Sequence, residues 1–99
     1  MTKKISKSKT TPYDSAEYLD SDEAINAYME EALETDDPAF IAQALGTIAR
    51  ARGMSKVAKQ SGLSRESLYK ALSADGNPEF GTVMRVMQAL GLKLSVKAQ

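Results

Sequence analysis

Gly53 and Gly62 constrain this chain most, because they divide a long helical pattern into short pieces. Glycine ends helices by adopting a left-handed conformation that other residues avoid. Residues 54–73 therefore predict two short helices joined at Gly62, where we expect a positive φ. The inner faces of these two helices are predicted to carry small and aliphatic side chains, namely Val57, Ala58, Leu63, Leu68 and Leu72.

The spacing of these inward residues fits the helix-turn-helix, whose second helix enters the major groove of DNA. A small residue is followed by a glycine four positions later and by an aliphatic residue six positions beyond that. The stretch MSKVAKQSGLSRESLYKALS thus resembles the helix-turn-helix of phage repressors and related regulators. The alternative is a plain corner of a helical bundle, in which Arg65 and Lys70 are ordinary solvated charges.

The outward residues of this hairpin are mostly polar, and several suit contacts with DNA. Arg65 can donate two hydrogen bonds to a guanine edge, and Lys70 suits the phosphate backbone. Ser55 is expected to cap the first helix, where exposed N–H groups can meet a phosphate. The predicted DNA-binding residues are Ser55, Lys56, Ser64, Arg65, Glu66, Ser67, Tyr69, Lys70 and Ser73.

Apolar residues at helical spacing predict further helices on both sides of the hairpin. The first runs over about 21–35, with Asp20 as its expected cap. The second starts with Asp37 as cap and Pro38 in the first turn, and it ends at Gly53.

The C-terminal part predicts a helix from Pro78, with Phe80 facing inward, and then a short strand over 92–96. A strand needs a ladder partner, and nothing else in the sequence has a strand pattern. Pairing with a second copy, or with a strand of another protein, is therefore favoured over an extended tail that packs on the core. The predicted dimer contacts are Leu92, Leu94 and Val96. The expected fold is all-α, a five-helix phage-repressor-like domain with this strand paired across a dimer.

Charge is strongly segregated along the chain, although the net charge is zero. Residues 1–12 hold four lysines and no acid, and residues 13–37 hold ten acids and no base. Residues 38–99 hold nine bases against three acids, so two partners of different kinds are indicated. We expect 1–12 to be a flexible basic tail, 13–36 an acidic segment with its helix, and 37–99 the DNA-binding domain.

The acidic segment has two interpretations. Its apolar stripe could pack on the rest of the chain, which leaves the acids as a solvated face. Alternatively, the segment docks on a basic partner protein, because opposite charge speeds encounter and the stripe supplies affinity. The candidate partner-binding residues are Tyr13, Tyr18, Leu19, Ile25, Tyr28 and Met29.

The sequence contains neither cysteine nor histidine. Disulfides and thiolate metal sites are therefore excluded, and the commonest general base and metal ligand is missing. We expect no catalytic activity, no metal and no cofactor, because there is also no Gly-rich phosphate loop. No apolar run is long enough to span a bilayer, and residues 1–12 lack the apolar core of a secretory signal, so a cytoplasmic location is expected.

Over about 13–96 the chain resembles the small antitoxins of type II toxin–antitoxin systems, in the group of probable addiction module antidote proteins. The stretches that carry the resemblance are YDSAEYLDSDEAINAYMEEALE, DPAFIAQALGTIARARGMSKVAKQSGLSRESLYKALS and GNPEFGTVMRVMQALGLKLSV. The resemblance implies a neighbouring toxin similar to the RelE/ParE type, which is basic and which the antitoxin binds and neutralises. It also implies repression of the shared operon through the helix-turn-helix. The alternatives are a stand-alone transcriptional regulator and a protein–protein adaptor that does not touch DNA.

Overall fold

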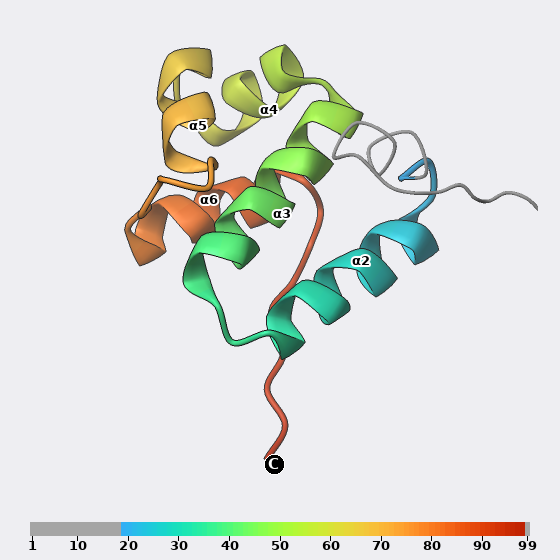
Figure 1. Ribbon diagram of the computed structural model, residues 1–99. Coiled ribbons are helices and arrows are strands. Elements are labelled where there is room, and N and C mark those ends of the chain that lie inside the picture. The colour runs from blue at the N-terminus through green and yellow to red at the C-terminus, as the bar shows by residue number, and fades with distance from the viewer. Residues whose placement is uncertain (1–18, 99) are drawn as a thin grey trace, which may run out of the picture.

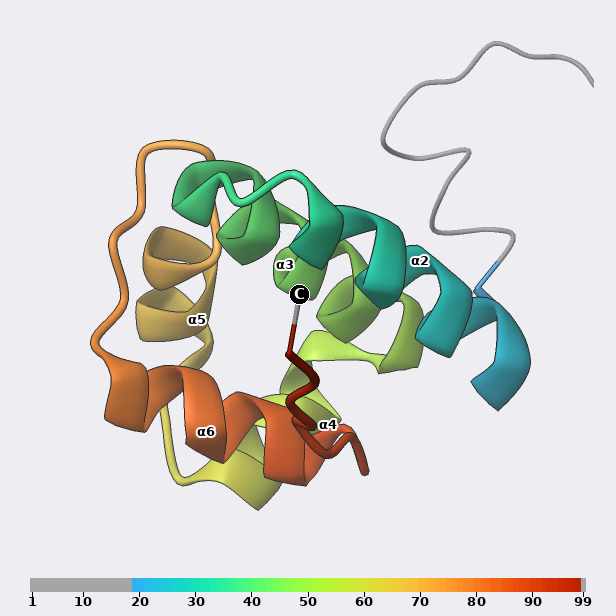
Figure 2. The same cartoon turned by 90° about the horizontal axis from the view of Figure 1, so that it is seen from below.

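The computed structural model describes residues 19–98, and this part of the chain folds into five α-helices, as the sequence predicted (Figure 1). In chain order they are α2 (Asp22–Glu34), α3 (Pro38–Arg52), α4 (Met54–Ser61), α5 (Arg65–Ala71) and α6 (Phe80–Ala89). Helix α3 contacts α2, α4 and α5, while α6 packs on α4. In both views α2 and α5 lie on opposite sides of α3 (Figures 1 and 2). None of the described helices is long and apolar enough to cross a membrane.

Local capping fixes where α2 and α3 begin. Ser21 precedes α2, and its hydroxyl accepts a hydrogen bond from the amide of Ala24 at 3.1 Å. The prediction of Asp20 as this cap is wrong by one residue, because Ser21 is the residue placed three positions before that amide. At α3, the Asp37 carboxylate accepts a first-turn amide at 3.1 Å and Pro38 occupies the first turn, as predicted.

One hydrophobic core runs through all five helices. Its largest fully buried side chains are Ile25, Leu45, Ile48, Leu68, Leu72, Val57 and Val86. The predicted inner residues of the α4–α5 hairpin are therefore buried, apart from Leu63, which is half-buried. Each fully buried aliphatic side chain stabilises the fold by roughly 1.5–3 kcal/mol relative to exposure. The α4–α5 hairpin is thus an integral part of the core.

Helices α3 and α5 approach each other closely at Gly46. A Cβ atom built on Gly46 would overlap the carbonyl oxygen of Leu72 and would lie 3.2 Å from the Leu72 Cβ. Leu72 is the cap residue directly after the end of α5. Glycine is therefore required here because there is no room for a Cβ atom, and not because of an unusual backbone conformation. The close contact sets the position of the end of α5 on α3.

The predicted C-terminal strand is not present in the part of the chain that the structure describes. Residues 92–98 have no regular secondary structure. Leu92 is half-buried against the core and its amide donates to the carbonyl of Met87 at 2.8 Å, while Leu94 and Val96 are 37% and 96% exposed. A strand forms only with a ladder partner, and the described residues contain no other strand. The segment is instead an extended tail, and pairing across a dimer stays a prediction.

Helix α6 begins at Phe80, two residues later than the predicted start at Pro78. The prediction that Phe80 faces inward is wrong, because this side chain is 70% exposed. The buried residues of α6 lie in its second half, at Val86 and Met87, so the first residue of the helix extends past the core.

Candidate nucleic-acid interface

The turn between α4 and α5 is built around Gly62. This residue has a φ of 78°, which confirms the predicted left-handed conformation. The amides of Gly62 and Leu63 both donate to the carbonyl of Ala58, at 3.0 and 3.2 Å. These two bonds give hydrogen-bond donors to a carbonyl in the last turn of α4, and the chain reverses within a few residues. The hairpin geometry therefore follows from one glycine and one shared acceptor.

Serine hydroxyls close both ends of α5. The Ser64 Oγ accepts the amide of Ser67 at 3.0 Å and donates to the Ser67 Oγ at 2.9 Å. The half-buried Ser73 donates its hydroxyl to the carbonyl of Lys70 at 3.0 Å. All three serines were predicted to bind DNA. In this structure they hold the helix ends, and Ser64 in particular is occupied as the cap.

Helix α5 turns most of its surface toward solvent. Leu68 is fully buried, whereas Arg65, Glu66, Ser67, Tyr69 and Lys70 are exposed. Side chains on this face are accessible to a partner and are carried by a helix that is anchored in the core through Leu68.

Arg65 lies over the ring of Tyr69, with its Cζ atom 5.8 Å from the ring centroid. An exposed cation–π contact of this kind contributes about 0.5–1 kcal/mol, so it favours one orientation of the guanidinium. The sequence analysis placed Tyr69 among the DNA-binding residues and missed this contact. The signal was present, because residues four apart on a helix are neighbours on its surface.

The start of α4 differs from the prediction. Ser55 and Lys56 are both exposed in its first turn, but Ser55 does not cap the helix. The helix starts two residues earlier than a Ser55 cap would place it, at Met54, with Gly53 as the cap residue and without a side-chain cap. Met54 is 5% exposed, so its burial in the core draws the first residue into the helix.

The apolar stripe of α2 packs inside the fold. Three of the predicted partner-binding residues are buried in the core, namely Leu19, Ile25 and Met29. Tyr28 is half-buried and packs against the same core, and Tyr13 and Tyr18 lie outside the described residues. This placement matches the alternative in which the stripe packs on the rest of the chain. A side chain covered by its own chain cannot contact a partner while the fold persists.

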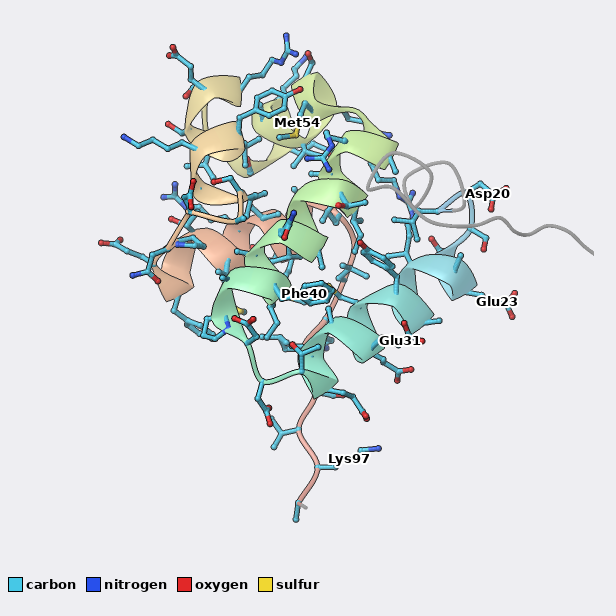
Figure 3. All side chains as sticks on the ribbon, in the orientation of Figure 1. Asp20, Glu23, Glu31, Phe40, Met54 and Lys97 are labelled. Carbon is cyan, nitrogen blue, oxygen red and sulfur yellow. The ribbon has the colours of Figure 1, made fainter. Side chains whose placement is uncertain are left out.

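The outer face of α2 is acidic. Its exposed carboxylates are Asp22, Glu23, Glu30, Glu31 and Glu34. Figure 3 shows Glu23 and Glu31 pointing away from the rest of the fold. Asp22 accepts a hydrogen bond from Arg52 Nη2 at 2.7 Å and so joins the start of α2 to the end of α3. An exposed ion pair contributes at most about 1 kcal/mol, so this contact positions the helix more than it stabilises it.

The exposed cations lie on other elements. Four of them fall within ten residues at the junction of α3 and α4, at Arg50, Arg52, Lys56 and Lys59, and no acid interrupts this run. Helix α5 adds Arg65 and Lys70. Because α2 and α5 flank α3 on opposite sides (Figure 1), the carboxylates of α2 lie apart from Arg65 and Lys70 of α5, whereas Arg52 at the end of α3 meets Asp22.

Comparison with known proteins agrees with the resemblance found in the sequence. A family model described as probable addiction module antidote protein matches residues 9–98. The chain is also 54% identical over 85 residues to an uncharacterized protein of Haemophilus influenzae, and the alignment covers 86% of this chain and 88% of the relative. No solved structure matches the chain. The family match extends over every helix described above, and the chain therefore belongs to the probable addiction module antidote protein family.

Proposed function

We propose that this chain is the antitoxin of a type II toxin–antitoxin pair, which neutralises a RelE/ParE-like toxin by direct binding and represses its own operon by binding operator DNA. Membership of the antidote family supports the antitoxin role. The observation that carries the rest is the separation of exposed carboxylates on α2 from the exposed face of α5, on opposite sides of α3. One small domain can therefore bind a basic protein and a polyanion at the same time.

In the proposed DNA complex, α4 and α5 act as a helix-turn-helix with α5 in the major groove. Arg65, steadied by the ring of Tyr69, donates two hydrogen bonds to a guanine edge. Glu66 accepts from the amino group of a cytosine, and Lys70 binds a phosphate. Only the exposed residues of α5 take part, because Leu68 is buried in the core.

We further propose that two copies bind one operator. Helix-turn-helix dimers read half-sites about 34 Å apart, one helical turn of DNA. The exposed side chains of Leu94 and Val96 on the C-terminal tail are candidates for the dimer contact. Sedimentation of the operator complex is expected to give two chains per duplex, and a complex of one chain per duplex would contradict this proposal.

Replacing Arg65 with alanine is expected to cost about 1–3 kcal/mol of operator affinity and to relax the preference for one base pair. The reason is that the bidentate contact with guanine is lost, while the fold keeps its buried anchor. The measurement is a gel shift at fixed salt with the promoter DNA and with a duplex of scrambled sequence.

Lys70→Ala is the matched control for Arg65→Ala, because both residues are exposed on α5. Loss of a phosphate contact is expected to weaken binding to all sequences equally and to lower the salt slope by about 1. If Arg65→Ala also weakens both duplexes equally, Arg65 does not read bases.

The toxin is proposed to bind the outer, acidic face of α2 rather than the buried stripe. Its exposed carboxylates attract a basic protein over a distance of about one Debye length, roughly 8 Å at physiological salt. Leu33, which is 39% exposed on this helix, adds an apolar contact.

The double substitution Glu30→Lys and Glu34→Lys is expected to lower the association rate with the toxin by about ten-fold or more at low salt, because it reverses the attraction. Glu79→Lys, at the start of α6, makes half of this charge change; it is the control and should have little effect. The toxin used is the small basic protein encoded beside this chain. Growth arrest that persists when the wild-type chain is co-expressed would reject neutralisation, and an equal effect of Glu79→Lys would reject the α2 face.

A stand-alone regulator is the second candidate function. The burial of Ile25 and Met29 favours it, because α2 then serves as a structural helix without a partner. The neighbouring gene distinguishes the two functions, since a small basic open reading frame is required for the antitoxin. Both functions involve binding only, with no catalysis and no cofactor, and both place the protein in the cytoplasm with its operon.

A further inference from the structure

A second basic surface lies where α4 faces α6. The end of α3, one flank of α4 and the end of α6 surround an open hollow of about 400 Å³. Its cationic and amide side chains are Arg52, Lys56, Gln60, Arg85 and Gln88. The described residues that line it include no carboxylate and no residue of α5.

The chemistry of this hollow selects an anion with several oxygen atoms. Three cations and two amides from three different helices supply positive charge and hydrogen-bond donors and acceptors, and the lining is more polar than apolar. Arginine guanidinium groups match phosphate in particular, because their planar donors bind two oxygens at once. Sites for small organic ligands are enclosed and mostly apolar, whereas this hollow is open and charged. A segment of a polyanion that passes over the surface fits it better.

We propose that the hollow seats a backbone phosphate of the operator, so that the DNA footprint extends from the α4–α5 hairpin to Arg52 and Arg85. This inference rests on the proposed DNA binding. It follows from the position of the hollow on α4, because the first helix of a helix-turn-helix crosses the DNA backbone. Lys56 belongs to both surfaces, since it is exposed in the first turn of α4 and also lines the hollow.

The contacts already made by Arg52 leave it able to bind a phosphate. Its guanidinium carries five donors, and one Nη2 bond goes to Asp22 at 2.7 Å. The side chain is 39% exposed, so its remaining donors can reach solvent or DNA. The bond to Asp22 also steadies the guanidinium at the rim of the hollow.

Arg85→Gln tests this assignment, because Arg85 is exposed and its loss leaves the core intact. Removing one phosphate contact lowers the slope of log K against log salt by about 0.9 and weakens binding by about five-fold at 0.15 M salt. The loss should be equal on operator and scrambled DNA, and Arg85→Lys should restore most of it because the charge is kept. The measurement is fluorescence anisotropy of the full chain with labelled promoter DNA at several salt concentrations.

Lys97→Gln is the matched control, since it removes one exposed charge from the C-terminal tail, far from α4 and α5 (Figure 3). If Arg85→Gln changes the salt slope no more than Lys97→Gln while Arg65→Ala still weakens operator binding, the hollow does not bind DNA and the proposed function stands. If the wild-type chain does not bind the promoter DNA at all, the proposed function fails. If Arg85→Gln leaves DNA binding unchanged but abolishes binding of a poly-glutamate peptide, the hollow belongs to an acidic protein segment.

Discussion

Replacing Gly46 with alanine is expected to lower the free energy of unfolding by about 2 kcal/mol. The added methyl group overlaps the carbonyl oxygen of Leu72 and crowds its Cβ atom at 3.2 Å, so α3 and α5 must move apart. Forcing atoms into a packed core costs typically about 1–3 kcal/mol, and overlap with a backbone oxygen lies at the upper end of this range. Alanine gains about 1 kcal/mol in helix propensity over glycine, which is too little to offset the overlap. Urea unfolding followed by circular dichroism measures the change.

Gly81→Ala is the matched control for this substitution. Gly81 also lies within a helix, but a Cβ atom on it would have no neighbour within 4 Å. Its replacement is expected to be neutral or to stabilise the fold by up to about 1 kcal/mol. The changes in the free energy of unfolding caused by the two substitutions should therefore differ in sign. A similar small change for both would mean that α3 and α5 are not in close contact.

Replacing Ile25 with alanine is expected to lower the free energy of unfolding by about 3 kcal/mol. Ile25 is 1% exposed, and deleting buried methyl groups costs about 2–5 kcal/mol because a cavity remains. Domains of this size have a total stability of about 5–15 kcal/mol, so the loss is a large part of it. The same urea titration distinguishes the two interpretations of the apolar stripe, since a stripe that only binds a partner contributes nothing to the isolated chain.

Leu33→Ala provides the comparison on the same helix. Leu33 is 39% exposed, and we expect its replacement to cost well under half of the Ile25 effect. If Ile25→Ala leaves the isolated chain as stable as Leu33→Ala does, then α2 is not part of the core and the stripe is available to a partner.

Some signals that act within a few residues were read correctly from the sequence, whereas two caps were misplaced, since Ser21 and Gly53 take the positions predicted for Asp20 and Ser55. Gly62 ends α4 in the left-handed conformation, as predicted. The predicted cap Asp37 and the first-turn Pro38 likewise start α3. These features depend on a residue and its immediate neighbours along the chain, so they need no knowledge of the fold.

Features that depend on distant neighbours were not accessible. The stripe of α2 requires some apolar cover, but its periodicity does not say whether α3 or another protein supplies it. Alternation over 92–96 indicates a strand, yet a strand exists only with a partner that a single chain does not contain. Arg52 and Arg85 meet at one hollow although they are far apart in sequence, so no local pattern points to them.

The packing of α2 onto α3 through Ile25 and Met29 has a thermodynamic consequence. Since one cooperative unit contains both the acidic helix and the α4–α5 hairpin, any molecule that recognises α2 only in its folded form raises the melting temperature of the entire domain. By mass action, such a ligand at one hundred times its Kd adds about 2.7 kcal/mol. Capture of the proposed toxin on α2 would in this way protect the α4–α5 hairpin, the proposed DNA-binding element, from unfolding without touching it.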